Sequence, residues 1–203
     1  MAAVTLAHGN PSYTNVDVVE DGDLTIRVVE YDKFVMREEG NDPVVSKITD
    51  IQVSRQIIAQ NSLFLERMLR SPNSREAAQH TVKLEGDSGK SLEIWFRAFH
   101  NKMTDETFMV PLEEMWHLVA ACDKYDFGIM ELQKWFSDWY RHQDAENLEG
   151  RERELLYPCW VFDHAEGFRL ATRLLAYDFV GHITESNPTE HYELHLPARI
   201  IRM

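Results

Sequence analysis

The sequence predicts an α+β fold, with strands concentrated in the first half of the chain and helices in the second. From Leu24 to about Tyr31 apolar and polar residues alternate, which is the period of a half-buried strand. Beyond residue 88 the apolar residues recur every three or four positions, which is the period of helices that bury one face. The chain has 203 residues, 44% of them hydrophobic, so it has enough apolar surface for a packed core.

The stretch from Ile51 to Leu69 is the centre of this prediction. It ends a strand with Ile51 and Val53, and then it changes to helical spacing. Ser62 interrupts the helical run and belongs to a residue type that caps helices. Two short helices packed against each other are therefore expected rather than one long helix. This unit has a largely apolar surface that the rest of the chain must cover.

The other elements of the first half follow from turn and strand signals. Residues 1 to about 20 show little periodicity and are expected to form a flexible arm. Residues 34–37 are expected to extend the sheet, and residues 38–43 form a polar loop. Three strands are expected, at Leu24 to Tyr31, Val44 to Val53 and Thr81 to Leu84.

The second half is expected to be mainly helical. Asp87 or Ser88 caps the first of these helices. Residues 103–110 are expected to be extended, and Pro111 suits the first turn of the next helix. Trp116 lies off the apolar face of that helix, so it is expected to be partly exposed, in a groove or against the C-terminal part. Further helices are expected at Ile129 to Arg141, Glu154 to Phe162 and Ala165 to Tyr177.

Charge and cysteine content narrow the class of protein. The net charge of −13 argues against nucleic acid and anionic membranes as partners, because phosphate binding needs a basic face. Cys122 and Cys159 form no CxxC pair and are expected to be buried free thiols in a reducing compartment. The N-terminus lacks the pattern of a secretory signal, and no apolar run approaches the length of a membrane span. A cytoplasmic or nuclear protein is expected.

The order of the predicted elements resembles that of a BTB/POZ domain. Gly22 to Ile26 resembles the opening strand of that family, and Ile51 to Leu69 resembles its second strand and first helical hairpin. Val119 to Asp126 looks like its A-D-K-Y signature in the fourth helix. The C-terminal segments LLYPCWVFDHAEGF and GHITESNP, together with HLP, resemble the helical extension of filamentous-fungal BTB proteins.

The resemblance implies a small three-stranded mixed sheet capped by a cluster of five to six helices. It divides the chain into an arm at 1–20, a BTB/POZ domain at 21–141 and a helical extension at 142–203. It implies a non-enzymatic protein–protein interaction module that forms a homodimer or recruits another protein. The alternative is a substrate adaptor for a cullin-type ubiquitin ligase. The nearest counterpart of the hydrophobic-x-Glu motif of cullin-binding members, Ser74 to Glu76, lacks the hydrophobic residue.

The candidate site residues lie in and beside the hairpin. Asp23 and Arg55 match the acidic and basic residues that line the charged pocket of BTB dimers. Two interpretations stay open, an ion pair that holds the strand to the helix and a pocket that serves an interface, because isolated charges at such positions are costly. The outer face of the hairpin is the first place to look for a partner, with the residues Gln56, Gln60, Glu66 and Arg67.

A second alternative is a nucleotide-binding enzyme that uses the loop Gly86 to Ser91. This loop ends in Gly-Lys-Ser between a strand and a helix, but a phosphate-binding loop needs glycine at the position of Leu84. A capped helix start is therefore the preferred interpretation. His191 and His195 have the best metal-like spacing, but they lack a third ligand at a matching spacing. The sequence assigns no catalytic residue, cofactor or metal.

Overall fold

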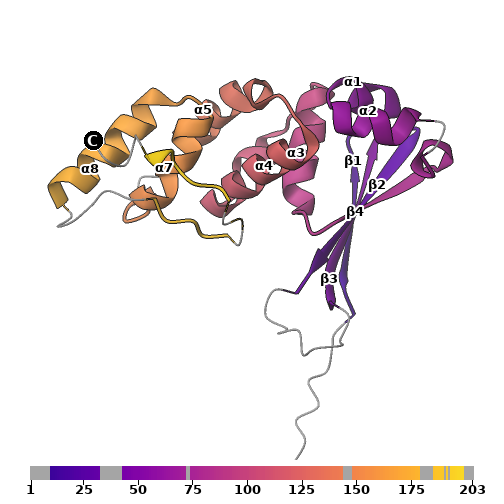
Figure 1. The fold of residues 1–203 in the computed structure, drawn as a ribbon, viewed down its shortest axis with the longest axis horizontal. Coiled ribbons are helices and arrows are strands. Elements are labelled where there is room, and N and C mark those ends of the chain that lie inside the picture. The colour runs from indigo at the N-terminus through magenta and orange to yellow at the C-terminus, as the bar shows by residue number, and fades with distance from the viewer. Residues whose placement is uncertain are drawn as a thin grey trace, which may run out of the picture.

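The computed structural model describes residues 10–32, 43–71, 74–143, 148–178, 185–189, 191 and 193–198. Over these residues it confirms the α+β class, with a mixed sheet and seven α-helices. The molecule is elongated, with the sheet at one end, α3 and α4 in the middle and α8 at the other end (Figure 1). None of the helices that the structure describes is long and apolar enough to cross a membrane.

The sheet has four strands in the order β1-β3-β2-β4, so the prediction of three strands is wrong. Strands β2 (Leu24–Tyr31) and β3 (Val45–Val53) are antiparallel and lie where the alternating pattern predicts them. Strand β4 (Thr81–Glu85) pairs parallel with β2. The additional strand is β1 (Ser12–Asp17), which pairs parallel with β3 inside the segment predicted as a flexible arm.

Strand β1 was not predicted because its side chains are almost all exposed, so its sequence has no alternation of apolar and polar residues. Only Val16 in it is even half-buried. The strand is held by its backbone pairing to β3 and by a polar cluster in which the Tyr13 hydroxyl and the Arg27 guanidinium both donate to the Asp50 carboxylate. The predicted sheet extension over residues 34–37 lies outside the described residues.

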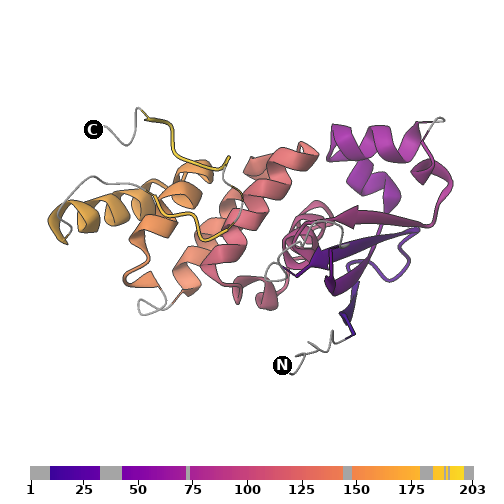
Figure 2. The same ribbon diagram turned by 60° about the horizontal axis from the view of Figure 1, so that its bottom comes forward.

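The helical hairpin follows β3, as predicted. Helices α1 (Arg55–Gln60) and α2 (Leu63–Arg70) are separated at Ser62, whose hydroxyl accepts from the backbone N–H of Leu65 at 2.9 Å. The hairpin lies at the sheet end of the molecule, far from α8 (Figure 2). The prediction of two short helices with a serine cap between them is confirmed.

The remaining helices mostly begin and end near the predicted residues. Ser88 caps the first of them by accepting from the N–H of Ser91 at 3.3 Å. Residues 103–110, predicted to be extended, instead contain a short 3-10 helix at Asp105–Phe108. The α-helices are α3 (Gly89–Phe99), α4 (Leu112–Tyr125), α5 (Gln133–His142), α7 (Glu152–Val161) and α8 (Ala165–Asp178).

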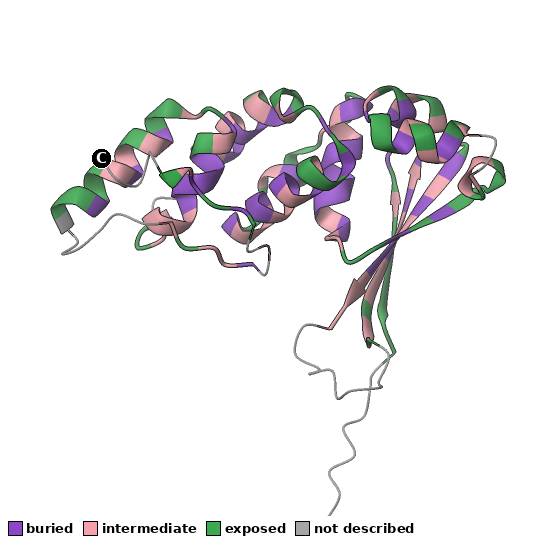
Figure 3. Ribbon diagram, viewed as in Figure 1, coloured by how far each residue is buried: buried purple, intermediate pink, exposed green. Residues whose placement is uncertain are grey.

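The core joins the inner face of the sheet to α3 and continues through α4 to α7. Buried residues run along the whole of α3, whereas exposed ones mark the outer side of the hairpin and of α8 (Figure 3). Buried tryptophans join these layers because each indole N–H finds an acceptor: Trp95 donates to Leu118 O, Trp139 to Val110 O and Trp135 to Thr107 Oγ1.

Trp116 joins α4 to α7. It is fully buried, so the prediction of partial exposure is wrong, but its predicted contact with the C-terminal part is confirmed. Its ring stacks on Tyr157 at 4.9 Å between centroids, and its indole N–H donates to the Glu154 carbonyl at 3.0 Å. That carbonyl lacks its usual helical partner, because the residue four positions later is Pro158, which has no N–H. Trp116 therefore supplies the hydrogen bond that Pro158 removes from α7.

We predict a coupling between these two positions. Trp116→Phe leaves a buried carbonyl without a donor and is expected to lower the free energy of unfolding by about 2 kcal/mol. Pro158→Ala restores the N–H, so it is expected to stabilise the Trp116→Phe protein by about 1 kcal/mol more than it stabilises the parent chain. Urea denaturation of the four proteins in the cycle measures this difference, and equal effects of Pro158→Ala in both backgrounds would contradict the assignment.

Candidate protein-interaction site

The first helix of the hairpin is capped by residues from other parts of the chain. Ser54 occupies the N-cap position of α1 but makes no side-chain cap. Instead the backbone N–H of Arg55 donates to Asp23 Oδ1 at 2.7 Å, and the N–H of Ser54 donates to His100 Nε2 at 3.0 Å. These two acceptors satisfy N–H groups that the start of a helix leaves without partners. The loop before β2 and the end of α3 thereby fix where the hairpin begins.

His100 can play this role only as a neutral imidazole. Its Nδ1 lies 2.7 Å from the Phe96 carbonyl, which can only accept, so Nδ1 carries the hydrogen and Nε2 is free to accept. The ring is buried, and burial lowers the pKa of His100 below its ordinary value, because a charged imidazolium loses its hydration there.

Arg55 caps the other end of the hairpin. Its guanidinium points at backbone carbonyls where α2 and the following 3-10 helix (Glu76–Ala78) end, those of Leu69, Glu76, Ala77 and Gln79. A cation at this position satisfies carbonyls that helix ends leave free and complements the negative end of the helix dipole. The predicted pair of Asp23 and Arg55 is thus a real contact, but Asp23 bonds the backbone of Arg55 and not its guanidinium. Both side chains hold the hairpin in place.

Ser62 fastens the middle of the hairpin to the end of α4. Its buried hydroxyl donates to the Tyr125 carbonyl at 2.6 Å while it caps α2. Residues Ser62 and Phe127 also form an isolated antiparallel bridge. The Phe64 ring packs edge-on against Tyr125, with 5.4 Å between the centroids. Because these contacts use the inner side of the turn, Leu63 and part of Phe64 are left on the outside.

Two grooves run along the outer face of this hairpin. The first groove, of about 800 Å³, lies between α2 and the end of α4 and is lined by Leu63, Phe64, Arg67, Met68, Ser71, Ser74, Lys124 and Asp126. The second groove, of about 550 Å³, lies at the turn between α1 and α2 and is lined by residues 59–63, Glu66, Asp126, Gly128 and Glu131. They share Leu63 and Asp126, so they adjoin. Leu63 is 57% exposed and Phe64 is 45% exposed.

The predicted outer-face residues divide between these grooves. Arg67 lines the first, and Gln60 and Glu66 line the second, whereas Gln56 is exposed on α1 and lines neither. Sequence reasoning missed Leu63, which is apolar yet lies off the buried face of α2. That mismatch is the signal that could have identified it.

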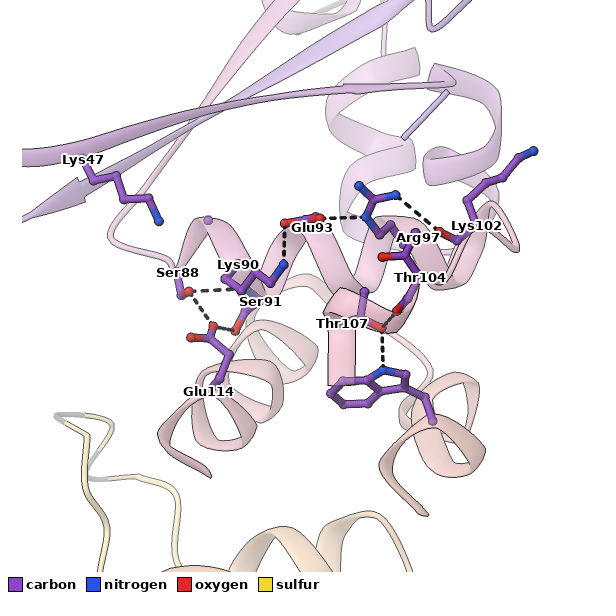
Figure 4. A network of polar contacts seen from close by, with 12 residues as sticks. Lys47, Ser88, Lys90, Ser91, Glu93, Arg97, Lys102, Thr104, Thr107 and Glu114 are labelled. Atoms are coloured by element: carbon purple, nitrogen blue, oxygen red, sulfur yellow. Dashed lines mark hydrogen bonds and ion pairs between the residues drawn. The ribbon is translucent and has the colours of Figure 1, made fainter. Parts of the chain in front are cut away.

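The hydrogen-bond donors of the loop Gly86 to Ser91 are bound by carboxylates of the protein itself. Ser88 and Ser91 both donate to Glu114 Oε1 at 2.5 Å, and Lys90 pairs with Glu93 at 3.1 Å (Figure 4). The backbone N–H of Gly89, which would face a phosphate, instead donates to a carboxylate oxygen of Glu30 at 3.2 Å. The donors that a phosphate would need are thus already engaged by anions, which supports the interpretation as a capped helix start.

Gly89 is required by packing in this loop. A Cβ atom at its position would lie 2.5 Å from the hydroxyl of Thr49 in β3. A side chain there would push α3 away from the sheet, so the glycine of the Gly-Lys-Ser sequence has a structural reason of its own.

The candidate metal ligands do not converge. His191 meets His117 of α4, with 3.0 Å between Nε2 and Nδ1, and His195 is not part of this contact. A carboxylate oxygen of Glu113 lies 3.7 Å from His117 Nε2, and one of Glu193 lies 3.7 Å from His191 Nδ1. No group of three ligand side chains is found over the described ranges. Burial raises the pKa of the Cys122 thiol to about 11 and that of Cys159 to about 12, so neither thiol is activated.

We predict that Asp23 acts as a cap rather than as a charge. Asp23→Asn keeps an oxygen acceptor for the Arg55 N–H and is expected to change the free energy of unfolding by less than about 0.5 kcal/mol, whereas Asp23→Ala is expected to cost about 1 kcal/mol. Chemical denaturation measures both, with Asp21→Ala on the same loop as the control. An ion pair would instead make the Asn variant as unstable as the Ala variant.

We predict that His100 makes the fold sensitive to acid. Its pKa is lowered in the folded state, so the stability it contributes is present above its unfolded pKa of about 6.5 and is lost as the pH falls toward the folded value. The free energy of unfolding is expected to fall by up to about 1.4 kcal/mol per pH unit in this range. Urea titrations of the parent and of His100→Gln measure it. An identical slope in the variant would contradict the assignment.

The chain matches no protein-family model and no curated protein. Any function must therefore be inferred from the geometry of the hairpin and of its two grooves.

Proposed function

We propose that the chain is a non-enzymatic protein–protein interaction module of BTB/POZ type, and that its partner binds on the outer face of the hairpin. The observation that carries the proposal is the exposure of Leu63 and Phe64 at the junction of two adjoining grooves. Apolar side chains rimmed by polar ones, in a concave surface on a fixed scaffold, are typical of protein contacts. The partner is a second copy of the chain or another protein.

The attachment of the hairpin supports this proposal. Asp23, His100 and Ser62 tie it to the loop before β2, to α3 and to α4. A surface fixed at three points loses little conformational entropy when a partner binds, so more of the contact energy appears as affinity. From β2 to α3 the order of strands, hairpin and helix agrees with the order that the BTB/POZ resemblance leads us to expect, whereas β1 and the 3-10 helix at Asp105–Phe108 depart from it.

The alternative functions lack comparable support. In the segment that corresponds to the cullin-binding motif, the Ser74 hydroxyl donates a hydrogen bond to the Glu76 carboxylate at 2.5 Å. The glutamate of the motif is therefore already engaged within the chain. Ser74 lines the first groove, so adaptor function would place a cullin there. Binding of a cullin N-terminal domain in a pull-down assay would favour that alternative. A nucleotide at Gly86 to Ser91 would have to displace the carboxylates of Glu30 and Glu114.

We predict that Leu63→Asp removes the association. The side chain is largely exposed, so the melting temperature is expected to stay within a few degrees, whereas binding is expected to weaken at least about tenfold because the charge must be desolvated at the contact. Sedimentation velocity over a range of concentrations measures self-association, and affinity capture with each variant measures recruitment.

Met109→Asp is the matched control, because Met109 is 82% exposed and lies outside both grooves. A chain that stays monomeric at high concentration, and that captures the same proteins with and without Leu63→Asp, would contradict the proposed function.

A further inference from the structure

The two grooves of the hairpin face form one path with opposite charges at its ends. The first groove follows α2 toward Ser71 and carries the cations Arg67 and Lys124. The second continues to Gly128 and carries the carboxylates Glu66 and Glu131. Asp126 and Leu63 belong to both and mark the middle of the path.

At each end of the path, one charged side chain makes no ion pair with the residues that the structure describes. Lys124 already pairs with Asp87 at 2.8 Å, and Glu66 already pairs with Arg70 at 3.1 Å. Arg67 and Glu131, in contrast, are both exposed, and neither side chain has an ion pair or hydrogen bond with any residue that the structure describes. Charges that are solvated in the free chain can pair with a ligand without breaking an internal contact.

Apolar side chains lie beside Asp126 in the middle of the path. Leu63 and Phe64 are exposed there, and Met68 lies half-buried beside them in the first groove. Met and aromatic side chains form adaptable and strong contacts at protein interfaces. A ligand that follows the path therefore meets a cation, an apolar centre and carboxylates in turn.

We propose that the hairpin face binds a polypeptide segment of another protein in which an apolar residue lies between an acidic flank and a basic flank. The acidic flank pairs with Arg67, the apolar residue contacts Leu63 and Phe64, and the basic flank pairs with Glu131. This inference rests on the proposed function and adds the chemistry and the direction of the ligand. The net charge of −13 attracts the basic flank over long range and repels the acidic flank. The acidic flank therefore depends on the local positive charge of Arg67 for its contact.

A displayed random-peptide library selected on the full chain tests this inference. The enriched peptides are expected to share an apolar residue with acidic residues on one side and basic residues on the other. Fluorescence anisotropy of the tightest peptide is expected to show about tenfold weaker binding to Arg67→Glu and to Glu131→Lys, since each places like charges together. A peptide with its acidic flank made basic is expected to recover affinity for Arg67→Glu. Arg173→Glu, a charge reversal at an exposed residue of α8 outside both grooves, is the control and is expected to bind like the parent.

The outcomes separate this inference from the proposed function. Two outcomes would overturn the inference and leave the proposed function standing, provided that the peptides lose affinity for Leu63→Asp. In the first, the enriched peptides share no ordered charge pattern. In the second, they bind Arg67→Glu and Glu131→Lys as tightly as they bind the parent. Peptides whose binding ignores Leu63→Asp, or the absence of any enriched peptide, would overturn the inference, whereas sedimentation velocity and affinity capture with Leu63→Asp decide the proposed function separately. Circular dichroism and melting of each variant exclude unfolding as the cause of a loss.

Discussion

The hairpin of α1 and α2 depends on acceptors and donors that other elements supply. Neither of its helices is long enough to be stable alone, because short helices in water are marginal. Asp23 and His100 accept the first N–H groups of α1, and the Arg55 guanidinium satisfies the carbonyls at the end of α2. Ser62 ties the turn between them to α4. If these contacts were absent, the hairpin would depend on the burial of its apolar side chains, such as Ile58, Leu65 and Leu69, for its position.

This constraint determines which side chains stay outside. The inner side of the hairpin is used by the bond between Ser62 and Tyr125 and by Leu65 and Leu69, which are buried. The outer side is left with Leu63 and part of Phe64, next to charges of both signs. The same contacts that stabilise the fold therefore create the two grooves, and a rigid hairpin presents them in one arrangement. The rest of the helical part extends away from this face toward α8 (Figure 1).

The sequence predicts the elements whose burial has a clear period. Buried residues alternate in the first half of β2 and the second half of β3, and the cap at Ser62 divides a helical run, so their bounds agree closely with the prediction. Strand β1 was missed because an exposed edge strand leaves no hydrophobic pattern. The 3-10 helix after α3 was missed because one short turn has no period to detect.

The site was only partly predictable, because its contacts join residues that are distant in the chain. Asp23 was identified, but its acceptor role and that of His100 depend on backbone groups that only the fold brings near. The grooves arise where α2 packs on the end of α4, and Lys124 and Asp126 come from that second element. A pattern within one helix could have placed Leu63 off the buried face of α2, but it cannot show which residues of α4 lie opposite.

Hydrogen exchange of the full chain, with and without a saturating peptide selected on it, tests whether partners bind on the outer face of the hairpin. If partners bind on the hairpin face, protection from exchange is expected to concentrate at residues 59–71 and 124–131, with α8 and β1 unchanged. Protection confined to the sheet or to α7 and α8, with the hairpin unaffected, would contradict it.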